Sequence, residues 1–418
     1  MRDSIPQLID HLFRHQAGRL VSHLVRALGP ASVDLAEDVV QDALVTALRR
    51  WPFDGVPDDP AAWLARVSRN KALDVLRRQT TLRSKLPALE AQALHTSEEQ
   101  SASARFSDEL DDDVLRMIFA CCHPSIPSDA RGPLTLKLAC GFGIGEIASA
   151  FLLREQTVAQ RIVRAKRQLR LGTIEVEVPG PGGIAERVDS VLEVLYLMFN
   201  EGYAAHQGED LVRADLVEEA IRLAQLLTSH EMTALPQSHA LLSLMLLQGS
   251  RLPARVDRKG RLVLLADQDR SLWDPHFIAA GFRHLSLASA GAHLSEFHVQ
   301  AAIAACHIAA TRAEDTDWAQ ILAHYDTLVE HAPSPVAYLN RVVAVAKVHG
   351  AAAGLDALDA IETAALDDYA LLPATRGELL QQIGRHDDAA EAFARARDLA
   401  RTEPERRFLE ARIRHLTD

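Results

Sequence analysis

Basic and amide side chains are concentrated in one stretch, residues 154–170, which reads REQTVAQRIVRAKRQLR. Its apolar residues recur at helical spacing and define one stripe of a predicted helix: Val158, Ile162, Ala165 and Leu169. The opposite face carries Gln156, Gln160, Val163, Arg164 and Arg167, and it is flanked by Arg161, Lys166 and Arg170. In the major groove, arginine pairs with guanine edges and glutamine with adenine edges, while flanking cations hold phosphates. The pattern therefore favours a DNA-reading helix, with a basic surface helix of a bundle as the alternative.

A shorter helix is predicted immediately before this stretch. Gly143 stands at its N-cap position and Glu146 at the third helical position, which is the arrangement of a capping box. Ile147, Ala148 and Phe151 are expected to face inward. The break at residues 153–155 then separates this helix from the basic one, so the pair predicts a helix-turn-helix unit.

A second polar face is predicted on a helix over residues 34–50, which we expect to begin with a capping box formed by Asp34 and Glu37. The apolar side of this helix is formed by Ala36, Val40, Ala43, Leu44 and Ala47. The other side carries Asp38, Gln41, Asp42, Val45 and Arg49. Two carboxylates, an amide and an aliphatic patch suit docking to a basic protein surface, although such a face taken alone is more typical of a solvated helix.

A third candidate is the helix predicted over residues 60–78, with Asp59 as N-cap and Pro60 at the first helical position. Arg66, Asn70 and Arg77 fall on one side of it, with Trp63, Lys71 and Arg78 nearby. The preceding segment 51–59 is rich in Pro, Gly and Asp and is expected to be a loop. Cations with an aromatic ring and an amide can hold a single nucleic-acid strand. An amphipathic helix with extended arginines fits this segment equally well.

Composition and charge restrict the possible classes. The sequence contains no apolar run of the roughly 20 residues that a membrane helix needs, and its first residues lack a signal-peptide core. Four cysteines do not make a disulfide framework in a chain of 418 residues, so we expect a cytoplasmic protein. The formal net charge is −12. Residues 1–174 sum to about +2 and the remainder to about −14, so the acidity belongs to the second half.

Helical periodicity dominates, and the predicted fold class is all-α with several domains. Polar residues at 79–107 and Gly/Pro-rich residues at 172–183 read as linkers, and Arg261–Leu265 is the best strand candidate. Gly350 and Gly384 are 34 residues apart, the period of tetratricopeptide helix pairs, and a generic array of helical hairpins is the alternative. The segments expected are 1–78, 79–107, 108–171, 172–183, a helical extension at 184–310 and tetratricopeptide-like repeats at 311–418.

The remaining clusters of reactive residues are better explained structurally. Cys121, Cys122 and His123 are adjacent and lack a second pair at zinc-ligand spacing, so we expect buried thiols at a helix end and no metal site. Residues 200–203 with His206, and residues 267–270, combine carboxylates with His or Arg, but polar turns or ion pairs explain them better than catalysis. The sequence has no phosphate-binding loop and no nucleophile motif, so neither an enzyme nor a cofactor is expected.

The order of the three helices resembles that of the extracytoplasmic-function class of bacterial sigma factors, over residues 5–78 (region 2) and 108–171 (region 4). In that family the first matching helix grips the β′ clamp of RNA polymerase, which implies roles for Asp38, Gln41, Asp42 and Val45. The loop and the helix after it open the −10 promoter element, which implies roles for Trp63, Arg66, Asn70, Lys71 and Arg77. The basic helix reads the −35 element beside the β flap, which implies roles for Gln156, Thr157, Gln160, Arg161, Arg164 and Arg167.

The second half is similar to the extension of one subgroup of these factors, which carries a tetratricopeptide-like domain. Segments 198–224, 264–275 and 300–310 carry this resemblance. It implies a protein partner for the repeats, and we expect the acidic extension either to modulate region 2 or region 4 or to serve as a plain scaffold. Two other functions remain open: an operator-binding regulator with a helical-repeat sensor, and an enzyme whose pocket is lined by Glu201, Asp267 and Asp269.

Overall fold

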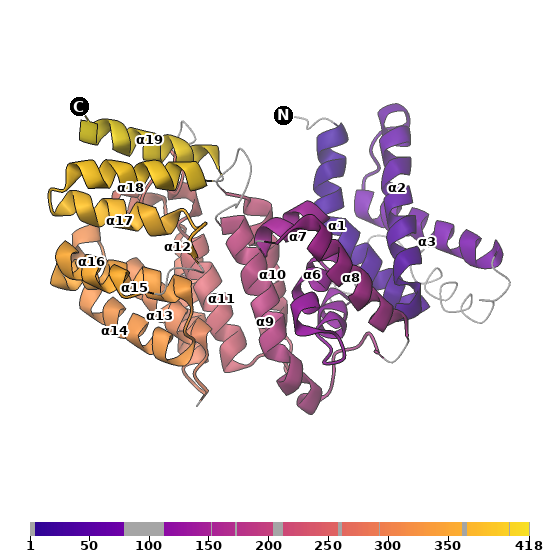
Figure 1. Cartoon of the computed structure of the whole chain (residues 1–418). Coiled ribbons are helices and arrows are strands. Elements are labelled where there is room, and N and C mark those ends of the chain that lie inside the picture. Colours follow the sequence, from indigo (N-terminus) through magenta and orange to yellow (C-terminus); the bar gives the residue numbers. More distant parts are fainter. Residues whose placement is uncertain are drawn as a thin grey trace. The chain divides into compact units, whose positions relative to one another are not determined.

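The structure is a computed structural model. The part of the chain that it describes is all-α, as predicted (Figure 1). The described residues are 5–78, 113–151, 153–171, 174–203, 212–257, 261–291, 293–361, 366–400 and 402–417. The predicted linker 79–107 and His206 lie outside them. The strand expected at residues 261–265 was a wrong prediction, because Leu262 forms only an isolated antiparallel bridge with Val256. No helix among the described residues is long and apolar enough to cross a membrane.

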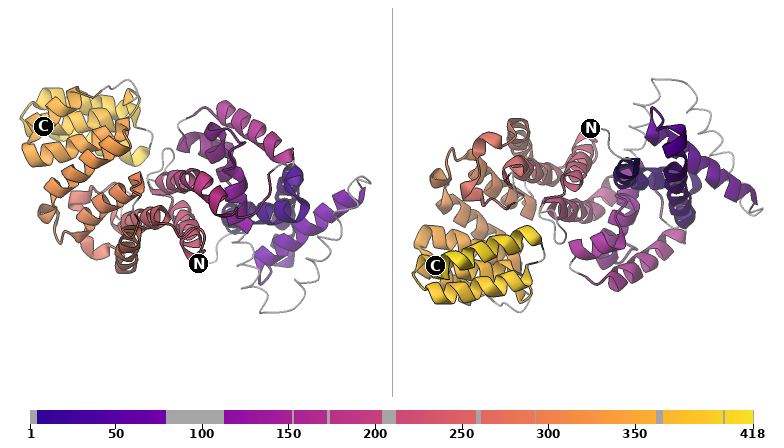
Figure 2. Two further views of the ribbon diagram at one scale, coloured as in Figure 1. Left: turned by 90° about the horizontal axis from the view of Figure 1, so that it is seen from below. Right: turned by 90° about the horizontal axis from the view of Figure 1, so that it is seen from above.

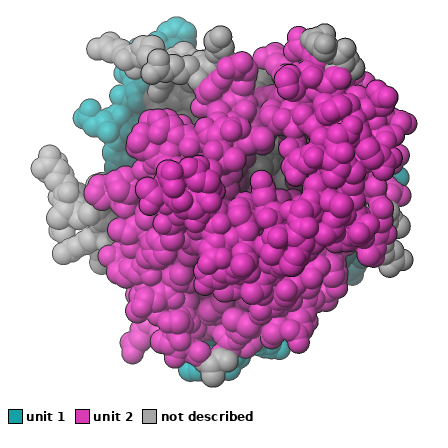
Figure 3. Space-filling view, turned by 90° about the vertical axis from the view of Figure 1, so that its left-hand side faces the viewer, with its two compact units in different colours: residues 1–197 teal, residues 198–418 magenta. Residues whose placement is uncertain are grey.

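The chain divides into two compact units, Met1–Leu197 and Met198–Asp418, which Figure 3 colours separately. The boundary falls inside helix α9 (Pro181–Tyr203). Gly182 and Gly183, which were assigned to the linker 172–183, are thus helical residues. Each unit is described below by itself.

Unit 1 begins with a three-helix bundle. Helix α1 (Ile5–Leu28) packs against α2 (Val33–Asp54) and α3 (Pro60–Arg78), and a short 3-10 turn, η1 (Pro30–Ser32), joins α1 to α2. The apolar stripe predicted for α2 is buried and extends to Trp51. Helix α3 has the predicted cap, since the Asp59 carboxylate accepts the backbone N–H of Ala62 at 2.9 Å.

A second group of helices in unit 1 comprises a helical segment at residues 113–121, α6 (Ser128–Leu138), α7 (Ile144–Ala150) and α8 (Glu155–Arg170). Helix α8 packs on both α6 and α7. Its buried residues are Val158, Ile162, Ala165 and Leu169, the predicted stripe. Cys121 and Cys122 are buried at the end of the segment 113–121, as expected, and burial raises the pKa of Cys122 to about 12.

The two groups of unit 1 meet at Gly18 of α1. A Cβ atom at this position would lie 2.3 Å from the carbonyl oxygen of Ala139, which directly follows α6. Only glycine allows this approach of the two backbones. Close by in sequence, the Ser22 hydroxyl donates to the Gly18 carbonyl at 2.8 Å. The bundle of α1–α3 is thereby packed directly against the group that contains α8.

Unit 2 is a succession of helices in which each packs on the next along the chain, and Figure 2 shows it from two further sides. Its α-helices are α10 (Ala214–Ser229), α11 (Pro236–Gly249), α12 (Pro275–Ala288), α13 (Glu296–Ala309), α14 (Trp318–His331), α15 (Pro335–His349), α16 (Ala351–Asp359), α17 (Leu371–Gln382), α18 (His386–Leu399) and α19 (Glu403–Thr417). Between α11 and α12 the chain forms the 3-10 turns η3 (Leu252–Ala254), η4 (Leu265–Asp267) and η5 (Arg270–Leu272), and η6 (Ala313–Asp315) precedes α14.

The two glycines that define the 34-residue spacing occupy equivalent turns in unit 2. Gly350 lies between α15 and α16 with φ = 92°, and Gly384 lies between α17 and α18 with φ = 80°. Both conformations belong to the left-handed region that favours glycine. The apolar stripe of α18 is buried in one core cluster: Ala389, Ala392, Phe393 and Ala396. Pro404 lies in the first turn of α19.

Candidate nucleic-acid interface

The outer face of α8 is exposed as predicted. Gln156, Gln160, Arg164 and Arg167 are all exposed. Val163, which lies among them, leaves 62% of its surface in solvent. Thr157 and Arg161, which were expected to join this face, are half-buried. The face thus presents two amides, two guanidinium groups and one aliphatic side chain, a set that can contact both base edges and thymine methyl groups.

The segment before α8 forms as predicted. The Glu146 carboxylate accepts the backbone N–H of Gly143 at 2.7 Å, which is the reciprocal half of the expected capping box. Helix α7 ends at Ala150 and α8 begins at Glu155. Phe151 approaches Gly132 of α6 so closely that a Cβ atom there would lie 2.4 Å from the ring. This packing fixes the turn between α7 and α8.

The basic residues that flank the outer face are engaged in ion pairs. Arg161 Nε lies 3.1 Å from Asp129 Oδ2 on α6. Arg170 Nη1 lies 2.5 Å from Asp34 Oδ2 on α2, and Lys166 Nζ lies 3.5 Å from Asp34 Oδ1. Lys166 also pairs with Glu37. We call Asp34, Glu37, Lys166 and Arg170 the α2–α8 clasp.

The clasp corrects the predicted start of α2. Asp34 and Glu37 were expected to form a capping box, but α2 begins at Val33 after η1, so Asp34 is already inside the first turn. Ser32 at the N-cap makes no side-chain capping bond. The two carboxylates are instead directed to the cations of α8, and they still lie near the positive end of the α2 dipole.

A double-mutant cycle measures the strength of the clasp. For Glu37→Gln and Lys166→Gln we expect a coupling energy of about 1 kcal/mol, at the upper end of the range for ion pairs, because both side chains are largely buried. Urea unfolding followed by hydrogen exchange of peptides from 155–170 provides the measurement. The same cycle on the exposed pair Asp74–Arg77 is the control and should give a distinctly smaller value. Equal coupling in the two cycles would show that the buried pair of the clasp is no stronger than an exposed ion pair.

The polar face predicted on α2 is also exposed: Asp38, Gln41, Asp42, Val45 and Arg49. Asp42 lies 3.6 Å from the Lys71 ammonium of α3. Asp34 precedes Asp38 by about one helical turn and Glu37 directly precedes it, so the clasp lies at one end of this acidic face. A partner that covers the face would therefore come close to the clasp.

On α3, the structure brings only part of the predicted set together. Arg66, Asn70 and Arg77 are exposed, whereas Trp63 is half-buried against Trp51, with ring centroids 5.4 Å apart in an edge-on arrangement. Lys71 pairs with Asp42 rather than standing free. Burial, together with the neighbouring Arg66, lowers the pKa of Arg69.

Phe53 is a residue that the sequence reasoning missed. Segment 51–59 was expected to be a loop, but α2 continues through Pro52 to Asp54 and ends at Gly55, where φ is 85°. Trp51 is consequently buried, while Phe53 leaves 88% of its surface in solvent at the helix end. Its position between Pro and Asp in a turn-rich stretch was the available signal for an exposed aromatic ring.

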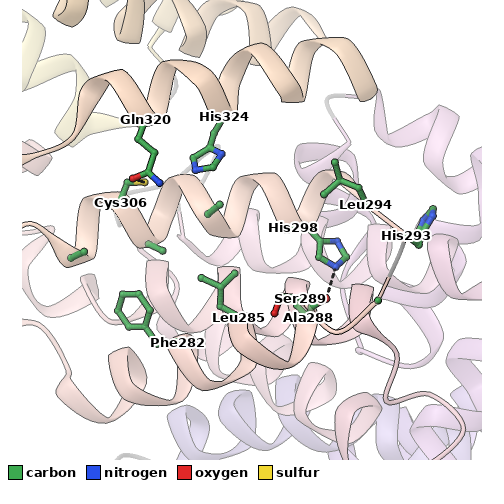
Figure 4. A pocket seen from close by; sticks show the side chains of 14 residues that line it. Phe282, Leu285, Ala288, Ser289, His293, Leu294, His298, Cys306, Gln320 and His324 are labelled. Carbon is green, nitrogen blue, oxygen red and sulfur yellow. Dashed lines mark hydrogen bonds between the residues drawn. The ribbon is translucent and has the colours of Figure 1, made fainter.

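Of the three carboxylates proposed for an enzyme site, Glu201 is buried in α9. Asp267 and Asp269 are exposed, and Asp269 accepts the backbone N–H and the hydroxyl of Ser271, which lower the pKa of its carboxyl. Unit 2 contains a cavity of about 680 Å³ between α12, α13 and α14 (Figure 4). Its lining is mostly apolar, with His298, His324 and Cys306, and includes none of the three carboxylates. Asp269 is therefore a turn residue, as the sequence favoured.

Comparison with known proteins identifies the family to which the chain belongs. The model of sigma-70 region 2 matches residues 12–81, and a family of unknown function (DUF6596) matches residues 187–289. The chain is 30% identical over 175 residues to the ECF RNA polymerase sigma factor SigL of Mycobacterium tuberculosis, covering 41% of this chain and 92% of SigL. It is 40% identical over 407 residues to the uncharacterized protein R00370 of Rhizobium meliloti, covering 95% of both. The chain belongs to the family of ECF RNA polymerase sigma factors.

Proposed function

We propose that the chain is a promoter-specificity subunit that binds core RNA polymerase through α2 and promoter DNA through α3 and α8. The observation that carries the proposal is the presence, in one compact unit, of an exposed acidic face on α2 and an exposed arginine-amide face on α8. The match of α1–α3 to sigma-70 region 2 favours this role over an operator-binding regulator, which has no use for a polymerase-docking helix.

On α2, the proposed contact with the β′ clamp involves Asp38, Gln41, Asp42 and Val45. Two carboxylates, an amide and an aliphatic group, all solvent-exposed, can pair with cations and cover an apolar spot on a partner. Asp42 lies 3.6 Å from the ammonium of Lys71, and 69% of its own side chain is in solvent, so it is accessible to a partner. Binding there is association, and no step of catalysis is assigned to the chain.

At the −10 element, we assign binding of the single DNA strand to Arg66, Asn70 and Arg77. Lys71 contributes to this binding once its ammonium leaves Asp42. Trp63 lies partly against Trp51 and presents only its remaining surface to a base. Phe53, which is far more exposed, adds an aromatic ring on which an unpaired base can stack.

At the −35 element, the helix-turn-helix interpretation of α7 and α8 assigns base reading to Gln156, Gln160, Arg164 and Arg167. Thr157 and Arg161 are assigned supporting contacts to the backbone, since both are half-buried. Lys166 and Arg170 can reach phosphates only if the clasp opens, because both are paired with α2 here. The β flap is the proposed protein contact of this group of helices.

Unit 2 is assigned a protein-binding role through its tetratricopeptide-like helices. Its segment of the chain carries most of the negative charge, so it repels DNA and favours a partner with a complementary surface. The two equivalent glycine turns support the repeat interpretation.

Capture of the chain by sigma-free core polymerase tests the docking face. Replacing Asp38 and Asp42 together with arginine should weaken binding at least about tenfold, because like-charge contacts at an interface cost several kcal/mol. Glu391→Arg, an exposed reversal on α18, is the matched control and should bind like the wild type. If the wild-type chain binds duplex DNA alone and never the polymerase, the operator-binding regulator is the correct function.

A further inference from the structure

Two arginines of unit 2 contact one buried tyrosine, and a third interacts electrostatically with one of them. Arg251 Nη2 donates to the hydroxyl of Tyr203 at 2.5 Å. The Arg255 guanidinium lies over the same ring, with its carbon 3.8 Å from the ring centroid. Arg270 stacks on Trp273 at 4.4 Å and donates to the carbonyls of His307 and Ala310. We call Arg251, Arg255 and Arg270 the arginine triad.

The hydrogen-bond acceptors that the described residues offer to the triad are neutral groups. Among the described residues, none of its members forms an ion pair with a carboxylate, and the acceptors are the Tyr203 phenol and the two carbonyls. Asp315 acts on Arg270 electrostatically, but its carboxylate already accepts two hydrogen bonds from Arg312. Three half-buried cations that form no ion pair within the described part of the chain are unusual, because buried charges are normally paired.

Within the described ranges, several donors around the triad have no hydrogen-bond acceptor. They are Arg251 Nε, Arg255 Nε, Arg270 Nη2 and the indole Nε1 of Trp273, all of them buried. The Trp273 side chain as a whole is only 6% exposed. The positive charge of the triad also affects neighbouring groups. Arg251 and Arg255 lower the pKa of the buried Tyr203. Burial, together with the charges of Arg251 and Arg270, lowers the pKa of His307 to about 4.

We propose that the arginine triad, with Tyr203 and Trp273, is a binding site for a small oxyanion, either a phosphate group or a carboxylate. Guanidinium groups bind both through paired N–H donors, and an anion would replace the neutral phenol as acceptor. Each arginine is half-buried, so part of each side chain reaches the surface. The site is independent of the DNA and polymerase faces, because all of its residues lie in unit 2.

Titration calorimetry of the full chain with inorganic phosphate and, separately, with succinate tests the site at constant ionic strength. Arg251→Gln and Arg270→Gln should each weaken binding roughly tenfold or more, as the loss of a charge-assisted hydrogen bond predicts. Arg283→Gln, an exposed arginine on α12, is the matched control and should change nothing. Tyr203→Phe keeps all three cations and should bind at least as tightly as the wild type.

The two probes distinguish the sources of the oxyanion. Binding of phosphate alone assigns a phosphate ligand, and binding of succinate alone assigns a carboxylate. Circular dichroism of each variant shows whether it folds, and Arg255→Lys, which keeps the charge, replaces any variant that does not. Failure of both probes to bind at millimolar concentration, or equal weakening by Arg283→Gln, would overturn the proposal.

Discussion

Replacing Asp113 with alanine should lower the free energy of unfolding of unit 1 by about 3 kcal/mol, the lower end of the range for breaking a buried ion pair. Asp113 is fully buried at the start of the segment 113–121. Its carboxylate lies 2.8 Å from His23 Nδ1 and Arg26 Nη1 of α1, and 2.9 Å from Arg116 Nη1. The loss stays near the lower limit because Arg26 and Arg116 remain partly hydrated.

Asp113 is important because it joins the two groups of helices in unit 1. Its loss leaves His23 buried beside two cations, next to the close approach of Gly18 and Ala139. Urea unfolding followed by hydrogen exchange in peptides from 16–28 and 113–121 measures the effect. Asp74→Ala, which removes an exposed partner of Arg77, should change stability by less than about 1 kcal/mol. Equal losses for the two variants would contradict the assigned role of Asp113.

Replacing Arg164 or Arg167 with alanine should reduce promoter-specific transcription by roughly tenfold to a hundredfold for each arginine that reads a base. A bidentate arginine–guanine contact contributes about 1–3 kcal/mol of discrimination, and both side chains are exposed on the outer face of α8. Run-off transcription with core polymerase, on a promoter that the wild-type chain opens, is the measurement. Arg395→Ala on α18 removes the same charge from unit 2 and serves as the control.

Base specificity separates reading from simple attraction to phosphate. If Arg164 reads one guanine, changing that base should reduce wild-type activity and have little further effect on Arg164→Ala. A uniform loss over all promoter sequences would instead indicate a phosphate contact. Unchanged transcription by both variants would contradict the assignment of α8 to the −35 element.

The faces of α2, α3 and α8 were predictable because helical periodicity is a local property. In α8 the buried stripe is set by residues within the helix, and all four of its members are buried. The cap of α3 is equally local, since Asp59 and Pro60 are adjacent to the helix they begin. These elements needed no knowledge of the rest of the chain.

What sequence reasoning missed depends on contacts between distant segments. Asp34 fits a capping box, but its partner Arg170 lies 136 positions away, and tertiary pairing decides the outcome. Trp51 precedes Pro52 in a turn-rich stretch, yet α2 continues to Asp54 and Trp51 is buried in the bundle. The arginine triad brings 3-10 turns and the end of α9 together, and no periodicity links Arg251 to Tyr203.

The most direct test of the proposed function is promoter opening. The full chain is mixed with core RNA polymerase lacking sigma and a pool of genomic fragments, and open complexes are identified by the reactivity of unpaired bases. The proposal predicts opening at a small set of sites that share −10 and −35 sequences, and its loss when Asp38 and Asp42 are replaced by arginine. A chain that opens no fragment with polymerase, while binding duplex DNA without it, would contradict the proposal.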